Sequence, residues 1–130
     1  MFISSNGVVK LGDLGLASQL EHSFSIRDTR CGTSCYMAPE MYDRKGCLGS
    51  DVWSLGISII EMAEGKNPFA GSASLQVMKA VCNGEPPSLT SPEWSSDLVA
   101  FVSQCLVKDV DKRWSVNELM RVRVASSSDK

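Results

Sequence analysis

The sequence predicts a mainly α-helical domain that carries one short β-hairpin near its N-terminus. Two short apolar runs flank an Asn-Gly pair within residues 2–11, and apolar residues recur at helical spacing between residues 50 and 120. A chain of 130 residues is long enough for one domain with a core and too short for two comfortable ones. Because a two-stranded hairpin is marginal by itself, we expect it to lie against the helices.

The hairpin is predicted by Phe2–Ile3 and by residues 8–11, with Asn6-Gly7 supplying the positive φ that a tight turn needs. Residues 18–36 are polar and show no sustained period, which is typical of a long loop. Long loops inside compact domains are usually functional or mobile.

Two helices are expected after this loop. Residues 50–64 are apolar around most of the helical circumference, which predicts a helix buried on nearly all sides that ends at Gly65. Residues 73–83 predict a shorter helix, with Gly84 as its stop and Leu75, Met78 and Cys82 on one face. Proline-rich residues 85–92 predict a turn-rich link.

Two more helices are expected near the C-terminus. Ser95 can cap a helix whose apolar stripe has the spacing of a core-facing surface and comprises Leu98, Phe101, Val102, Cys105 and Leu106. Ser115 and Glu118 have the spacing of a capping box, which predicts a last helix carrying Leu119 and Met120. We therefore expect one domain over residues 1–122, followed by a polar tail over residues 123–130.

The composition argues against several classes of protein. Hydrophobic residues make up 43% of the chain, charged residues 22%, and the net charge is −2. This balance gives no electrostatic case for binding nucleic acid or an acidic membrane surface. The sequence has no apolar run of about eighteen residues and no signal-peptide pattern at its start. We expect a cytoplasmic protein, with the nucleus as the alternative.

The five cysteines stand at positions 31, 35, 47, 82 and 105, without paired spacing. In a reducing compartment they are best interpreted as small buried hydrophobic residues. A zinc site formed by Cys31, Cys35, Cys47 and His22 is the alternative, but this spacing matches no common zinc pattern.

Four motifs stand out, and their order matters more than any one of them. Asp13-Leu14-Gly15 follows the second expected strand, and residues 32–40, ending in Ala-Pro-Glu, close the long loop. Ser50-Asp51-Val52-Trp53 opens the expected buried helix, and Arg113 lies near the end of the chain. Together, in this order and spacing, they are highly specific.

This set resembles the second half of a eukaryotic protein kinase domain over residues 2–122. The stretches VWSLGISIIEMAEGKNPF and PEWSSDLVAFVSQCLVKD are similar to the sterile-twenty-like and MAP kinase kinase groups. The resemblance implies a partial kinase-like fold, a C-terminal lobe without the N-terminal lobe or the catalytic loop. It also implies a serine/threonine kinase that transfers the γ-phosphate of ATP to protein Ser or Thr in a MAP-kinase-type cascade.

The resemblance assigns roles to residues of the Asp13-Leu14-Gly15 motif and to Asp51 at the start of the expected buried helix. Asp13 would bind the Mg²⁺ that bridges the ATP phosphates, and Gly15 would allow the sharp turn after it. Asp51 would accept hydrogen bonds from the backbone of the catalytic loop. Each aspartate also has a simpler interpretation, Asp13 as a turn residue and Asp51 as a charge favoured at a helix start.

Residues 13–40 would form the activation loop. Thr29 stands where related kinases are phosphorylated by an upstream kinase, although Ser18, Ser23 and Ser25 compete for that phosphate. Thr33 would belong to the substrate-side loop and favour Ser/Thr over Tyr substrates. Glu40 and Arg113 would form a buried, bidentate ion pair that ties the end of the loop to the helices.

The chain departs from the family pattern in several places. Leu14 stands where the family has Phe, Trp114 follows Arg113 where Pro is usual, and no His-x-Phe follows the last helix. The Gly-rich loop, the phosphate-gripping lysine, its glutamate partner and the His-Arg-Asp catalytic loop are not among these residues.

The missing motifs hold the adenine pocket, the general base and one metal ligand. We therefore expect the chain alone to be inactive, to bind ATP and Mg²⁺ weakly or not at all, and to need the first half of the domain as its partner. The alternatives are a catalytically dead kinase-like module that acts by protein binding, and a decayed product without a stable fold.

Overall fold

The computed structural model describes residues 2–12, 14, 34–43 and 45–122. In the order of the chain, the elements are β1 (Phe2–Ile3), β2 (Val9–Lys10), the 3₁₀ helix η2 (Ser34–Tyr36), α1 (Pro39–Tyr42), α2 (Leu48–Glu64), α3 (Ser74–Asn83), α4 (Ser96–Cys105) and α5 (Val116–Leu119). The mainly helical class with one short hairpin is confirmed.

The hairpin forms where the Asn-Gly pair predicts it. β1 and β2 are antiparallel, with Phe2 opposite Lys10 and Ile3 opposite Val9. Gly7 has a φ of 80°, and its N–H donates to the Ser4 carbonyl at 2.9 Å. The strands have only two residues each, and Phe2 and Val9 remain 62% and 56% exposed. The expectation that helices cover the hairpin is therefore wrong for these side chains.

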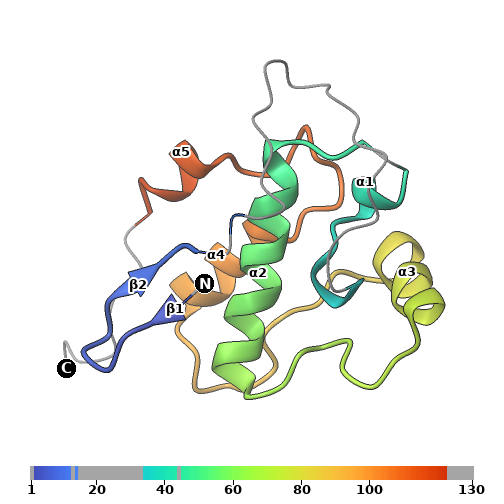
Figure 1. The fold of residues 1–130 in the computed structure, drawn as a ribbon. Helices are drawn as coiled ribbons and strands as arrows, with labels where there is room; N and C mark the ends of the chain where they lie inside the picture. The colour runs from blue at the N-terminus through green and yellow to red at the C-terminus, as the bar shows by residue number, and fades with distance from the viewer. Residues whose placement is uncertain (1, 13, 15–33, 44, 123–130) are drawn as a thin grey trace.

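Helix α2 runs through the middle of the fold, with α3 on one side and the hairpin and α5 on the other (Figure 1). It begins two residues before the predicted start and ends at Gly65, whose φ of 71° gives the left-handed cap that favours glycine. One face, which includes Val52, Trp53, Ile57 and Ile60, is buried.

The opposite face of α2 corrects the prediction of a helix buried on nearly all sides. Leu48, Leu55 and Met62 recur every seven residues and are 69%, 37% and 52% exposed. Seven residues are close to two helical turns, so these side chains form one stripe. Among the described residues, nothing buries this stripe, which we call the α2 stripe.

Helix α4 packs directly on α2. A methyl group placed on Gly56 of α2 would come within 2.8 Å of the Cβ of Cys105 and of a Leu106 methyl carbon, so the glycine permits a close approach. Val102, Cys105 and Leu106 are buried, which confirms the predicted stripe. The Ser95 hydroxyl caps α4 by accepting from the Leu98 N–H at 3.3 Å.

Helix α3 lies against η2 and α1, and the residues it buries are not those of the apolar face that the sequence singled out. Val77 and Val81 are the buried pair, while Leu75 is 59% exposed and Cys82 is also exposed. Both sets of residues have helical spacing, and contact with α1 and η2 selects the smaller valines. The Lys108 ammonium donates to the carbonyls of Cys82 and Gly84 and so satisfies the end of this helix.

The predicted capping box begins α5. The Ser115 N–H donates to the Glu118 carboxylate at 2.7 Å, and the Glu118 N–H donates back to the Ser115 hydroxyl at 3.3 Å. Leu119 is buried and Met120 is 79% exposed. Residues 123–130, predicted as a polar tail, lie outside the described residues.

The cysteines do not all behave as predicted. Cys105 is a buried core residue, but Cys35 and Cys47 are half-buried. Cys82, in the last turn of α3, is exposed. Burial raises the pKa of the Cys105 thiol to about 11, against a smaller opposite effect of Arg113, so Cys105 stays neutral.

Two further classes of feature are not found in the described part of the chain. Within residues 2–12, 14, 34–43 and 45–122, no three His, Cys, Asp or Glu side chains gather closely enough to hold a metal. His22 and Cys31 of the alternative zinc site lie outside these residues. No helix among the described residues has the length and apolar character needed to cross a membrane.

Candidate functional site

The Ala-Pro-Glu motif forms the first turn of α1. Ala38 is extended and precedes the helix, Pro39 occupies the first turn, and Glu40 is the acidic residue of that turn. The motif therefore presents the Glu40 carboxylate from a rigid turn at the end of the long loop. Arg113 approaches from a segment 73 residues away, between α4 and α5.

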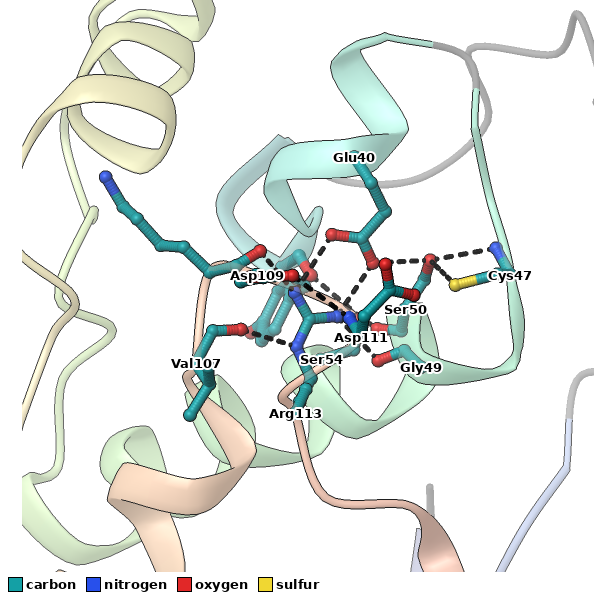
Figure 2. Close-up of polar contacts among 11 residues, drawn as sticks. Glu40, Cys47, Gly49, Ser50, Ser54, Val107, Asp109, Asp111 and Arg113 are labelled. Carbon is teal, nitrogen blue, oxygen red and sulfur yellow. Dashed lines mark hydrogen bonds and ion pairs between the residues drawn. The ribbon is translucent and has the colours of Figure 1, made fainter.

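Glu40 and Arg113 form a two-point ion pair (Figure 2). Arg113 Nη1 donates to Glu40 Oε1 at 2.7 Å, and Nη2 donates to Oε2 at 2.9 Å. The arginine side chain is fully buried and the glutamate side chain is 9% exposed. The two residues expected from the sequence to be partners are thus in contact, with the fork geometry that makes such pairs strong and directional.

Every N–H group of the Arg113 guanidinium has an acceptor. Besides the glutamate, Nε donates to the Val107 carbonyl at 2.7 Å, Nη1 to the Gly49 carbonyl at 2.8 Å, and Nη2 to the Lys108 carbonyl at 3.3 Å. An arginine carries five N–H donors, and all five are used. This matters because a buried charge is tolerated only when it is paired and hydrogen-bonded.

Glu40 also organises the start of α2. The Ser50 hydroxyl donates to Glu40 Oε1 at 2.9 Å and accepts from the Cys47 N–H at 3.1 Å (Figure 2). Ser50 therefore joins the carboxylate to a backbone N–H that precedes the first turn of α2. Through it, the ion pair positions the loop end, the start of α2 and the segment after α4 relative to one another.

The electrostatics of Glu40 combine two opposed effects. Burial acts most strongly and disfavours the charged form, but the hydrogen bonds and charge of Arg113, together with the Ser50 hydroxyl, outweigh it. The pKa of Glu40 is therefore lowered from its ordinary value, and the carboxylate is charged at neutral pH.

Trp53 lies beneath the ion pair. The Arg113 guanidinium carbon is 5.3 Å from the centre of the Trp53 ring, within the range of a cation–π contact. Trp53 is fully buried, and its Nε1–H has no acceptor among the described residues.

The 3₁₀ helix η2, at the end of the predicted loop, is held by a second group of contacts that the sequence reasoning missed. The Ser54 hydroxyl of α2 donates to the Tyr36 carbonyl at 2.8 Å, and the Tyr36 hydroxyl donates to Glu61 Oε2. Asn67 Nδ2 donates to the same oxygen at 2.9 Å. Ser54 and Glu61 are seven residues apart on one face of α2, which is the only sequence signal that links them.

These contacts also set the charge of the groups involved. The hydrogen bond to Glu61, with a smaller contribution from burial, raises the pKa of Tyr36. The bonds from Tyr36 and then Asn67 lower the pKa of Glu61. Tyr36 is therefore a neutral donor to a charged carboxylate. The Tyr42 hydroxyl adds a bond to the Ser34 carbonyl at 3.1 Å, so both ends of η2 are anchored.

The remaining predicted site residues fall into two groups. Asp51 lies in the first turn of α2 with an exposed side chain, and no hydrogen bond to it is found among the described residues. Asp13, Gly15, Thr29 and Thr33 lie outside those residues. The structure therefore brings together the structural pair but does not describe the metal-binding or phosphorylation positions.

Comparison with known proteins agrees with this geometry. The family model described as "Protein kinase domain" matches residues 1–124. The chain belongs to the protein kinase family. The chain is similar to the serine/threonine-protein kinase hippo of Drosophila melanogaster, with 39% identity over 123 residues. That alignment covers 92% of this chain and 18% of the relative, so the chain spans less than a fifth of the length of that kinase.

By family, then, the chain is part of a serine/threonine protein kinase domain. Kinases of this family use ATP and Mg²⁺ and act on protein substrates. Within the described residues, no three His, Cys, Asp or Glu side chains gather closely enough to hold a metal, and Asp13 lies outside those residues. Of the predicted site, the described residues contain the Glu40–Arg113 ion pair, and the structure brings these two residues into contact.

Proposed function

We propose that this chain is the C-terminal half of the domain of a Ser/Thr kinase, and that its role in the parent enzyme is to build the substrate side of the active site. The observation that carries the proposal is the buried pair of Glu40 and Arg113, which ties the loop end to the helices at 2.7 and 2.9 Å. A loop anchored in this way can hold an extended protein segment in register for phosphoryl transfer.

The parent enzyme supplies the remaining parts. Asp13 would bind Mg²⁺, because a hard cation prefers a carboxylate oxygen, and Asp51 would accept from the backbone of the catalytic loop. Thr29 would receive the activating phosphate from an upstream kinase, and Thr33 would lie beside the substrate hydroxyl. The α2 stripe supports the presence of a further part of the parent enzyme at this helix. Exposed apolar surface of this kind marks an interaction site.

The 130 residues alone are expected to be inactive. Phosphoryl transfer depends on positioning and on charge stabilisation, and the general base, the phosphate-gripping lysine and the adenine pocket are not in this sequence. ATP and Mg²⁺ are therefore expected to bind only when the first half of the domain is present. We place the parent in the cytoplasm, with the nucleus as the alternative.

A chimeric domain tests the proposal directly. The chain alone, and the chain joined to the first half of the kinase domain of hippo, would be incubated with labelled ATP, Mg²⁺ and a Ser-containing peptide. We expect no label transfer from the chain alone and transfer from the chimera. Asp13→Ala should abolish that transfer, and the matched variant Asp43→Ala, at an exposed position, should retain it.

Two outcomes would contradict the proposal. Transfer by the chain alone that disappears with Asp13→Ala would show that the chain is active by itself. A folded chimera without activity would show that these residues do not complete a kinase.

The cellular role is a finer proposal. We infer that the parent acts in a MAP-kinase-type cascade, on the strength of the stretches that follow Asp51 and Pro92. Removing the parent gene should then lower phosphorylation of a downstream MAP kinase after stimulation. Unchanged phosphorylation would contradict a role in this cascade, but it would leave the assignment as a kinase unaffected.

A catalytically dead module that acts by protein binding is the second candidate, and the α2 stripe is the observation that favours it. An antibody to residues 85–130 separates the two. A band in cell lysate well above 14.1 kDa favours the kinase, and a band at 14.1 kDa favours the binding module.

A further inference from the structure

The segment that joins α3 to α4 is extended and partly exposed, as are the short linear motifs that modifying enzymes bind. Residues 85–91 have no regular secondary structure, and Pro86-Pro87 and Ser91-Pro92 favour an extended backbone. Leu89 is 9% exposed and anchors the segment. Around it, Thr90 and Pro92 are exposed and Ser91 is half-buried. Both sequence neighbours of Ser91 are therefore exposed to solvent.

The same segment is held to the end of α2 by a single carboxylate. Glu64 Oε1 accepts from the Thr90 N–H at 2.8 Å, the Ser91 N–H at 3.2 Å and Trp94 Nε1 at 3.2 Å, and Oε2 accepts from the Thr90 hydroxyl at 3.1 Å. We call these four residues the Glu64 latch. It connects the C-terminal turn of α2 to the residues just before α4.

Among the described residues, hydrogen bonds stabilise the charge of the latch. Within the described residues, no Lys or Arg forms an ion pair with Glu64. The backbone N–H of Thr90, followed by that of Ser91, holds the pKa of Glu64 below its ordinary value. A second negative charge introduced at this point would therefore meet a carboxylate without a counter-charge among the described residues.

The two hydroxyl groups next to the latch are not equivalent. The Thr90 hydroxyl is engaged with Glu64, whereas no hydrogen bond to the Ser91 hydroxyl is found among the described residues. Ser91 is also the residue followed by proline, which has no N–H to offer an enzyme. Only a kinase that accepts proline directly after the target serine can use this site.

We propose that Ser91 is a phosphorylation site for a proline-directed Ser/Thr kinase, and that its phosphate opens the Glu64 latch. The Ser91 oxygen attacks the γ-phosphorus of ATP, the new O–P bond forms as the bond to the bridging oxygen of ADP breaks, and the hydroxyl proton passes to the base of that kinase. ADP leaves, and the phosphoserine carries a charge of about −1.5 to −2.

The consequence for the latch follows from the distances. The Ser91 N–H is itself a donor to Glu64 Oε1 at 3.2 Å, so a phosphate on Ser91 would sit on a residue whose backbone is already in contact with the carboxylate. Like-charge repulsion then weakens the bonds from Thr90 and Ser91. The junction between α2 and α4 loosens, while the Glu40–Arg113 pair, which uses none of these residues, stays intact.

Site mapping is the first test. The full chain would be incubated with a proline-directed kinase and ATP, and the phosphorylated residue located by mass spectrometry. We expect the phosphate on Ser91. Ser91→Ala should remove it, Thr90→Ala should retain it, and Pro92→Ala should lower its incorporation by about tenfold or more, because the enzyme selects the proline.

Three results of this mapping would overturn the site. They are phosphate on Thr90 instead of Ser91, incorporation that Pro92→Ala leaves unchanged, and no incorporation while a Ser-Pro peptide in the same reaction is labelled.

Hydrogen exchange tests the effect on the latch. Phosphorylation should speed exchange of the Thr90 and Ser91 amides by about tenfold, since bonds to a charged acceptor are lost. In the matched variant Glu64→Gln, which keeps the shape and removes the charge, phosphorylation should change exchange much less. Unchanged exchange, or equal acceleration in both proteins, would show that the phosphate does not act through Glu64.

Discussion

The ion-pair region and the N-terminal hairpin differ in how completely the described residues bury and pair their side chains. Around Arg113, every guanidinium N–H has an acceptor and the side chain is fully buried. In the hairpin, the turn is well formed, but Phe2 and Leu11 are 62% and 85% exposed. We therefore expect the ion-pair region to contribute far more to the free energy of unfolding than the hairpin does.

The largest expected effect comes from removing the arginine. Arg113→Ala leaves the Glu40 carboxylate buried without its partner, so it should lower the free energy of unfolding by about 3–5 kcal/mol. The matched variant Lys112→Ala breaks an ion pair with Asp109 whose side chains are 78% and 49% exposed. It should cost no more than about 1 kcal/mol. Urea denaturation followed by tryptophan fluorescence measures both, and equal costs would contradict the contrast.

Acid should weaken the same region, but less than truncation, because protonation keeps the side chain in place. The pKa of Glu40 is lowered in the folded chain from its ordinary value of 4.5. Its stabilising contribution is therefore present above pH 4.5 and is lost as the pH falls through the lower folded pKa. Urea midpoints between pH 6 and pH 3, measured for the wild type and Glu40→Gln, check this. The variant should lose less stability over that interval, and parallel curves would count against a charged Glu40.

The close approach of α2 and α4 gives the next test. Gly56→Ala places a methyl group 2.8 Å from a Cys105 carbon, and overpacking of this kind costs about 1–3 kcal/mol. Met62→Ala, on the exposed α2 stripe, removes a larger group but should cost less than about 1 kcal/mol. Thermal unfolding followed by circular dichroism compares them. A larger loss for Met62→Ala would mean that the stripe is covered.

A helix cap should have a smaller effect. Ser95→Ala removes the hydroxyl that accepts from the Leu98 N–H and should cost about 1 kcal/mol. Ser96→Ala, one residue further into α4 at an exposed position, should stay within about 0.5 kcal/mol of the wild type. The two urea midpoints are measured side by side. A lower midpoint for Ser95→Ala only would show that the helix cap stabilises the fold, whereas equal losses would show that removing either serine has the same effect.

The smallest effect is expected in the hairpin. Leu11→Ala should change stability by no more than about 0.5 kcal/mol, because the side chain is 85% exposed. Leu106→Ala, at a side chain that is 1% exposed, should cost about 2–5 kcal/mol. Similar losses for the two leucines would show that the hairpin is packed in solution and would remove the contrast between the regions.

Local signals predicted the local features of this fold. Asn6-Gly7 predicted the hairpin turn, Ser95 the start of α4, and the Ser115–Glu118 spacing the start of α5, because each depends on residues within a few positions. The inward face of α3 could not be predicted in this way. Leu75, Met78 and Cys82 fit one helical phase and the buried valines fit another, and only contacts with distant elements choose between them.

The candidate site divides along the same line. The partnership of Glu40 and Arg113 was expected from the resemblance to kinases, not from spacing, since 73 residues separate them. The bonds that Glu61 accepts from Tyr36 and Asn67, and the Glu64 latch, were missed. In the sequence, Glu61 and Glu64 resemble ordinary solvated charges near the end of a helix. Their partners lie up to 30 residues away along the chain, so local spacing does not reveal them.

Arg113 also has a consequence for the order of events in folding. Its acceptors come from three separate stretches of chain, at residue 40, residue 49 and residues 107–108. Until all three meet, the guanidinium is better hydrated by water than by any partial set of carbonyls, so no intermediate gains from burying it. Its stabilisation therefore comes late in assembly, after the chain has brought Glu40 and Arg113 together across 73 residues. We therefore expect Arg113→Ala to accelerate unfolding far more than it slows folding, which makes this residue a determinant of how long the folded state persists.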